Sequence, residues 1–221
     1  MTNSEVNYRH HAMSLEHYQR IVEYIGRWHL NIIDGQEKSY RYLLTEFILL
    51  LANTGLRFSE ARSLRWKDVN IVDTPESPMT QEALVVEIDI VNSISGSRYL
   101  VGCGGGIITR IKQLSNFTAQ NDYVFANDSA EKIESDIYFK LWQEVLVGAG
   151  LKQAERQYEY CSLRYSYANW RLYAGVDVDL ISQVMGITVE TIRKRYGHIN
   201  LQYRSAAAMF DVVSGTGRVG F

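Results

Sequence analysis

The sequence predicts a mainly α-helical domain with one small antiparallel β-sheet, an α+β fold. Apolar residues recur at helical spacing over most of the chain, and this period changes to that of a strand only between Pro75 and Val101. Both prolines of the chain lie in the loop before the strand-like stretch. With 221 residues, of which 46% are hydrophobic, the chain is long enough and apolar enough to bury a substantial core.

The N-terminal helices are predicted from apolar periodicity and from residue types that begin helices. A helix starts near Ser14, whose side chain can cap it. After a turn at residues 34–35, a strongly apolar helix runs over residues 38–53. Ser59 is expected to cap a third helix, which continues to Trp66.

A β-hairpin is expected in the middle of the chain. Residues 83–91 are rich in Val, Ile and Leu, the turn is Ser95-Gly96-Ser97, and the second strand covers residues 98–101. A further strand over residues 69–72 would flank this hairpin. Residues 102–106 include four glycines, which we interpret as a mobile loop. A phosphate-binding P-loop is disfavoured because no Lys-Ser or Lys-Thr pair follows these glycines.

The rest of the chain is predicted to be helical. Each segment has an apolar face, and Gly148, Gly150 and Gly175 provide the stops. The expected helices cover residues 107–114, 135–149, 162–174, 178–184 and 189–195, with a last one over 201–213 before a glycine-rich tail.

Composition excludes some classes of protein, but it does not by itself suggest DNA as a partner. The formal charge is −2 and the pI about 6.2, whereas nucleic-acid-binding domains are usually basic. Residues 151–221 nevertheless carry nine Lys and Arg against six Asp and Glu, a formal charge of +3. No apolar run approaches the roughly 18–20 residues of a membrane helix, and the first residues are polar and do not indicate a secreted protein. We therefore expect a cytoplasmic protein with no membrane partner.

Neither cysteines nor histidines indicate a metal site. Cys103 and Cys161 lie far apart, and neither has a neighbour at metal-ligand spacing. The histidines show no such spacing with acids or cysteines either. We expect no metal and no disulfide.

Three short motifs hold residues suited to phosphodiester chemistry. The first reads TGLRFSEARSLRW and contains Arg57, and the second reads CSLRY and contains Arg164. The third places Tyr196 ten residues after Gly186, in the frame RKRYGH. Arginine binds phosphate oxygens through a planar, permanently charged fork. Tyrosine is a nucleophile once its free pKa near 10 is lowered by nearby positive charge.

In order, spacing and flanking residues, these motifs resemble the catalytic domain of the tyrosine recombinase (phage integrase) family, over most of the chain. The resemblance implies that Arg57 and Arg164 bind the scissile phosphate and that Tyr196 attacks it. Glu60 and His198 would be supporting positions. The family's fold, an α-rich domain with one small antiparallel sheet, agrees with the fold class predicted above.

Three positions depart from the family pattern. The resemblance implies a lysine in the hairpin turn, where it would protonate the leaving 5′ oxygen, but this position is Ile94. No lysine lies between Lys67 and Lys112, so a shift of register does not supply one. The histidine of the second motif is replaced by Cys161, and the His or Trp after the glycine of the third motif is Ile187.

The resemblance implies a site-specific recombinase that cleaves and rejoins double-stranded DNA through a 3′-phosphotyrosyl intermediate, without a cofactor. We expect a flexible leader over residues 1–12, the catalytic domain over 13–200, and a C-terminal helix and tail over 201–221 that docks in trans. The family also implies a tetramer on DNA and an N-terminal DNA-binding domain, so the chain is expected to be either a fragment or a minimal recombinase. Two alternatives stay open: a catalytically weakened DNA-binding accessory protein on the same fold, and a type IB topoisomerase.

Overall fold

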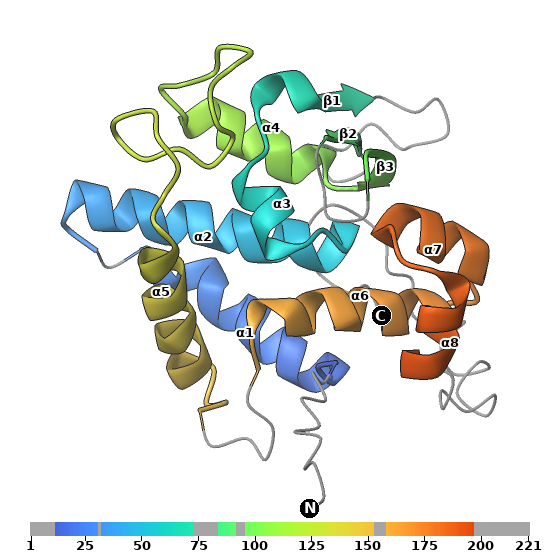
Figure 1. Cartoon of the computed structure of the whole chain (residues 1–221). Helices are drawn as coiled ribbons and strands as arrows, with labels where there is room; N and C mark the ends of the chain where they lie inside the picture. The colour runs from blue at the N-terminus through green and yellow to red at the C-terminus, as the bar shows by residue number, and fades with distance from the viewer. Residues whose placement is uncertain (1–11, 31, 73–83, 92–95, 153–157, 197–221) are drawn as a thin grey trace, which may run out of the picture.

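The computed structural model describes residues 12–30, 32–72, 84–91, 96–152 and 158–196, and of Arg195 and Tyr196 it describes the backbone alone. Within these residues the chain is mostly helical with a three-stranded antiparallel sheet, so the predicted fold class is confirmed (Figure 1). The expected leader, except its last residue, and the expected helix over 201–213 lie outside the described residues. No described helix is both long enough and apolar enough to cross a lipid bilayer.

The first two helices begin where polar side chains cap them. α1 (Leu15–Trp28) is capped by Ser14, whose hydroxyl accepts a backbone N–H at 3.2 Å. α2 (Gly35–Thr54) begins three residues earlier than expected. The reason is that the Asp34 carboxylate accepts the N–H of Glu37 at 2.7 Å and so caps the helix.

α3 (Phe58–Arg62) is shorter than predicted, and it begins after Arg57 at the N-cap position rather than after Ser59. The expected continuation to Trp66 is therefore wrong. That residue instead opens a separate 3₁₀ turn, η1 (Trp66–Asp68). Its backbone N–H donates to the carbonyl of Asp122 at 3.1 Å, a pairing with a distant loop that an unbroken helix would not allow.

The three predicted strands form, the first with its expected bounds and the two of the hairpin within two residues of theirs, while Ser95 of the expected turn lies outside the described residues. β1 (Val69–Val72), β2 (Val85–Ile90) and β3 (Arg98–Cys103) pair antiparallel in that order. In the register of the sheet, Ile88 lies opposite Leu100, and both side chains are fully buried. The sheet therefore has one apolar face, which packs toward α2 and α4.

The glycine-rich segment after β3 is not a loop, so this part of the prediction is wrong. Its glycines end the strand and begin α4 (Gly105–Leu114), and residues 104–106 are buried. A Cβ atom on Gly105 would lie 2.6 Å from Cβ of Leu84, and one on Gly104 would lie 2.9 Å from Cγ1 of Val86. The missing side chains allow α4 to start directly against β2.

The remaining helices agree with their predicted bounds to within two residues. They are α5 (Ser135–Gly148), α6 (Tyr160–Tyr173), α7 (Val178–Met185) and α8 (Val189–Tyr196).

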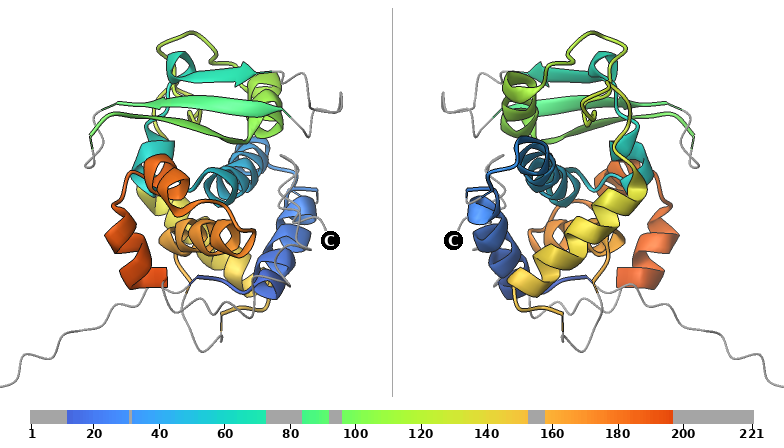
Figure 2. Two further views of the ribbon diagram at one scale, coloured as in Figure 1. Left: turned by 90° about the vertical axis from the view of Figure 1, so that its right-hand side faces the viewer. Right: turned by 90° about the vertical axis from the view of Figure 1, so that its left-hand side faces the viewer.

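α2 crosses the centre of the molecule (Figures 1 and 2). On one side of it lies the layer formed by the sheet and α4, and on the other lie α1, α5 and α6. α7 and α8 pack against α6 beside the end of α2.

An aromatic cluster around Phe47 of α2 occupies the core. The ring centroids of Tyr138 and Tyr160 lie 4.6 and 5.7 Å from that of Phe47. Phe58, the first residue of α3, joins the cluster at 5.6 Å. Such edge and tilted contacts favour one arrangement of the rings. They hold the start of α3, and therefore Arg57, at a fixed place on the core.

Candidate functional site

Gly55 ends α2 and turns the chain toward Arg57. Its φ of 65° lies in the left-handed region, and its N–H donates to the carbonyl of Leu51 at 3.0 Å. A Cβ atom at this position would lie 2.5 Å from Cδ1 of Tyr167 on α6. Glycine is required here both by the backbone conformation and by the close approach of the tyrosine ring.

Arg57 and Glu60 form an ion pair at the start of α3. The Glu60 carboxylate accepts the backbone N–H of Arg57 at 2.8 Å and its Nη1 at 2.7 Å. The side chain of Glu60 is only 6% exposed, whereas that of Arg57 is 24% exposed. The carboxylate thus lies beneath the arginine, and the guanidinium keeps a face toward solvent.

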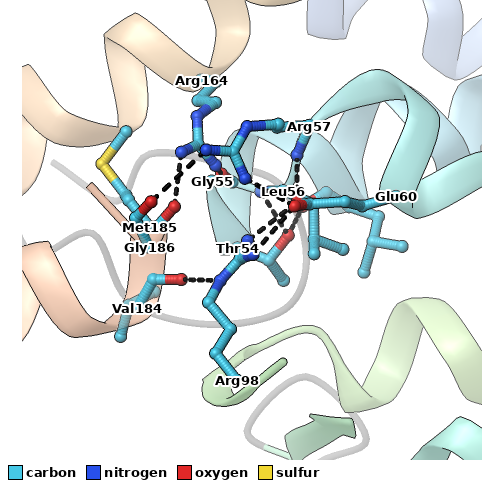
Figure 3. Close-up of polar contacts among 11 residues, drawn as sticks. Thr54, Gly55, Leu56, Arg57, Glu60, Arg98, Arg164, Val184, Met185 and Gly186 are labelled. Carbon is cyan, nitrogen blue, oxygen red and sulfur yellow. Dashed lines mark hydrogen bonds and ion pairs between the residues drawn. The ribbon is translucent and has the colours of Figure 1, made fainter. Parts of the chain in front are cut away.

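Arg164 joins the end of α2 to the end of α7. It lies on α6 next to the fully buried Leu163, which packs that helix into the core. Its guanidinium donates from Nη1 to the carbonyl of Gly55 and from Nη2 to the carbonyl of Met185 (Figure 3). Segments far apart in the sequence are brought together by these two bonds.

Three successive main-chain carbonyls at the end of α7 each accept a hydrogen bond from a different arginine (Figure 3). The pairs are Val184 with Arg98 at 3.0 Å, Met185 with Arg164, and Gly186 with Arg57 at 3.3 Å. Gly186 ends the helix in the left-handed conformation, with φ 59°. The last carbonyls of a helix lack partners within it, and here the arginines satisfy them.

Arg98 is the residue of this cluster that sequence reasoning missed. Its Nη1 and Nη2 donate to the two carboxylate oxygens of Glu60, each at 2.8 Å, and its side chain is only 9% exposed. The alternation of a strand could have indicated that Arg98 points inward. Residues two apart on a strand share a face, so Arg98 shares the face of Leu100, which is apolar and buried.

No family model matches the sequence, and no curated protein matches it. Solved structures do match. XerA recombinase is 18% identical with a TM-score of 0.63, over 93% of this chain and 65% of that chain. XerH site-specific recombinase bound to palindromic difH substrate is 19% identical with a TM-score of 0.65, and the match covers 94% of this chain and 55% of that chain. Tn1549 transposon integrase in complex with circular intermediate DNA is 15% identical with a TM-score of 0.60, and the match covers 94% of this chain and 68% of that chain. The chain has the tyrosine recombinase fold.

This chain spans 55–68% of the length of these three solved chains.

Tyr196, the expected nucleophile, is the last residue of α8. This helix contacts α6, which carries Arg164, and α7, whose carbonyls hold the arginines. Ile192 is buried and anchors α8, while Arg193 and Lys194 on the same helix are exposed. Two other expected positions of the recombinase site, Ile94 and His198, lie outside the described residues.

The two remaining departures from the recombinase pattern are described. Cys161 lies in the first turn of α6, and its Sγ donates to Glu159 at 3.4 Å. Burial, reinforced by Glu159, raises the pKa of this thiol to about 12, so it is protonated at neutral pH. Ile187 is half-buried against the core, and its N–H donates to the carbonyl of Ser182 at 3.2 Å. Neither side chain offers a strong donor to a phosphate.

Lys38 and Lys112 lie away from the arginine cluster. Lys38 lies near the start of α2, about 24 Å along the helix from Thr54 at 1.5 Å per residue. The ammonium of Lys112 lies 5.9 Å from the ring centroid of Trp66, a cation–π contact. Neither takes part in the arginine contacts described above. In the described part of the chain, no group of three or more His, Cys, Asp or Glu residues could hold a metal ion.

Proposed function

We propose that this chain is the catalytic part of a tyrosine-type site-specific DNA recombinase. The observation that carries the proposal is the meeting of Arg57 and Arg164 at the end of α7, where they donate to adjacent carbonyls. Two guanidinium groups at one place supply the charge and the paired donors that a phosphodiester requires. The similarity to recombinase and integrase structures supports the same function.

In the proposed reaction, a DNA phosphate is bound by Arg57 and Arg164, which neutralise its non-bridging oxygens. The phenolic oxygen of Tyr196 attacks the phosphorus, and the bond from phosphorus to the 5′ oxygen breaks. The product is a 3′-phosphotyrosyl link and a free 5′ hydroxyl. Attack of a 5′ hydroxyl from the partner duplex reverses the step and releases the tyrosine. Arg193 and Lys194, which are exposed and lie three and two residues before Tyr196, favour the phenolate and the nearby phosphate.

The departing 5′ oxygen needs a proton, and this is where the chain differs from its family. An arginine keeps its proton in proteins, so Arg98 is a poor acid. The Cys161 thiol, with a pKa of about 12, is weak as well. Loss of general acid help typically costs about 10²–10⁴-fold in rate. These features favour the second candidate function, a DNA-binding accessory protein on the same fold that recombines poorly.

Double-stranded DNA is the partner in both proposals. A tetramer on DNA, an additional DNA-binding domain and a cytoplasmic, nucleoid-associated location belong to the first proposal as well, because the family resemblance implies them. The chain spans only part of the solved recombinases that it matches, which is consistent with a further domain in the working protein.

The test uses a DNA duplex nicked near the point of exchange, so that cleavage releases a short fragment and traps the covalent protein–DNA adduct. Where the target sequence is unknown, relaxation of a supercoiled plasmid serves as the assay. We expect an adduct on a denaturing gel with the natural chain and none with Tyr196→Phe. Tyr99→Phe, which alters a half-exposed tyrosine of β3, is the matched control and should keep the adduct. Binding without any adduct would favour the accessory function.

A further inference from the structure

Glu60 is a buried carboxylate with two cationic partners. It accepts hydrogen bonds from the backbone N–H and Nη1 of Arg57 and from Nη1 and Nη2 of Arg98, all at 2.7–2.8 Å (Figure 3). A carboxylate that is 6% exposed is costly unless it is paired and hydrogen-bonded, and here it is both. One negative charge is therefore shared by two positive ones.

The two arginines share this carboxylate unequally. Arg98 binds both carboxylate oxygens through its two Nη atoms, the bidentate geometry that gives the strongest arginine–carboxylate pairing. Arg57 donates from its Nη1 to one carboxylate oxygen of Glu60 and from its Nη2 to the carbonyl of Gly186. The side chain of Arg57 is also the more exposed, at 24% against 9% for Arg98. Of the two arginines paired with Glu60, Arg57 therefore keeps more of its side chain accessible from solvent.

We propose that Arg98 is a positioning residue that neutralises Glu60 and so leaves the positive charge of Arg57 to act on a DNA phosphate. If Arg98 were absent, Arg57 would be the nearest counter-ion of a buried carboxylate, and the pair would be neutral. With Arg98 in place, the three side chains carry a net charge of +1, and the outermost one presents it. The inference rests on the proposed function, because it takes the ligand of Arg57 to be a phosphate.

The same residue also ties the hairpin to the end of α7. Arg98 is the first residue of β3, and its Nε donates to the carbonyl of Val184 at 3.0 Å. The carbonyls of the next two residues hold Arg164 and Arg57. A single side chain therefore fixes the hairpin, α3 and the end of α7 relative to one another. No proton transfer is assigned to it, since a guanidinium keeps its proton.

The test measures binding of a short fluorescent DNA duplex of arbitrary sequence over salt concentrations from about 50 to 200 mM. Each phosphate contact contributes about 0.9 to the slope of log K against log salt. Arg57→Ala should lower that slope by about 0.9. Arg98→Met should lower it by a comparable amount, because Arg57 is then held by Glu60. Arg98→Lys keeps a positive charge beside the carboxylate and should keep the slope.

A double variant separates positioning from direct contact. Adding Glu60→Gln to Arg98→Met removes the buried charge that would capture Arg57, so the slope should return toward that of the natural chain. If Glu60→Gln gives no recovery, Arg98 touches phosphate itself and the proposal is overturned. An unchanged slope in Arg98→Met alone would overturn it too.

Arg110→Met is the control for simple loss of a buried ion pair. Arg110 binds both oxygens of Glu46 at 2.8 Å, and that carboxylate is 4% exposed, but the pair joins α2 to α4 outside the arginine cluster. Arg110→Met should therefore lower the thermal midpoint of unfolding without changing the salt dependence of DNA binding.

Covalent trapping by Tyr196 is a separate readout. Absence of the adduct with the predicted slopes would remove the recombinase proposal alone, and an adduct with an unchanged slope in Arg98→Met would remove the Arg98 proposal alone.

Discussion

Replacing Gly55 by alanine should destabilise the fold through two separate effects. Alanine in the left-handed conformation that Gly55 adopts, with φ 65°, costs about 1–2 kcal/mol. Its Cβ atom would also lie 2.5 Å from Cδ1 of Tyr167, a ring that is only 6% exposed and cannot move aside freely. Overpacking of this kind costs typically about 1–3 kcal/mol. Together the effects predict a loss of about 2–5 kcal/mol in the free energy of unfolding.

The assay is urea and thermal unfolding followed by circular dichroism. For a domain of this size, about 2–4 °C is lost per kcal/mol, so we expect the midpoint to fall by about 4–20 °C. Gly175→Ala is the matched control, because Gly175 has φ 78° but no atom within 4 Å of an added Cβ. It should lose only the backbone contribution of about 1–2 kcal/mol. Gly26→Ala, in the last turn of α1 where no atom lies within 4 Å of an added Cβ, should instead stabilise by about 0.4–1 kcal/mol.

A double variant tests the steric part directly. In a Tyr167→Ala background the ring is gone, so the added cost of Gly55→Ala should fall to that of Gly175→Ala. If Gly55→Ala costs no more than Gly175→Ala in the natural background, the ring does not press on this turn and the reasoning is refuted.

Two further predictions concern the helices around the arginines. Burial and Glu159 raise the pKa of Cys161 to about 12, so only a very small fraction of it is thiolate near neutral pH, and this fraction increases as the pH rises toward that value. Iodoacetamide should therefore modify Cys161 very slowly near neutral pH, with a rate still rising above about pH 9. Peptide mass spectrometry measures this, and Glu159→Gln should move the rise to lower pH. Asp177 caps α7 by accepting the N–H groups of Asp179 and Leu180 at 2.8 and 3.3 Å, so Asp177→Ala should cost about 1 kcal/mol in urea unfolding. A loss as small as that of the exposed Asp179→Ala would contradict the capping role.

Much of the fold could be predicted because local signals agreed with the final packing. The hairpin followed from its period and its turn, and the C-terminal helices from their apolar faces and glycine stops. α2 began earlier than expected because a cap at Asp34 outweighs the poor helix propensity of Gly35. The glycines after β3 were misjudged because their purpose is close contact with Leu84 and Val86, which are distant in sequence.

The site was predicted less completely than the fold. Arg57 and Arg164 were marked by motifs, but Arg98 lies in no motif that the analysis of the sequence singled out as part of the site. Its role depends on Glu60 and Val184, residues of other elements, so it becomes visible only when those elements pack together. The acceptors at the end of α7 are main-chain oxygens, which every residue has, and composition therefore gives no sign of them.

These main-chain acceptors have a consequence for how far the sequence can drift. At positions 184 and 185 the arginines bind the peptide oxygen and not the side chain, so any apolar residue that fits the core there leaves the guanidinium groups in place. A scaffold of this kind can lose most of its sequence similarity while its arginines stay where they are. The solved structures that share this fold are only 15–19% identical to the chain, and main-chain acceptors of this kind place no demand on side-chain identity at these two positions.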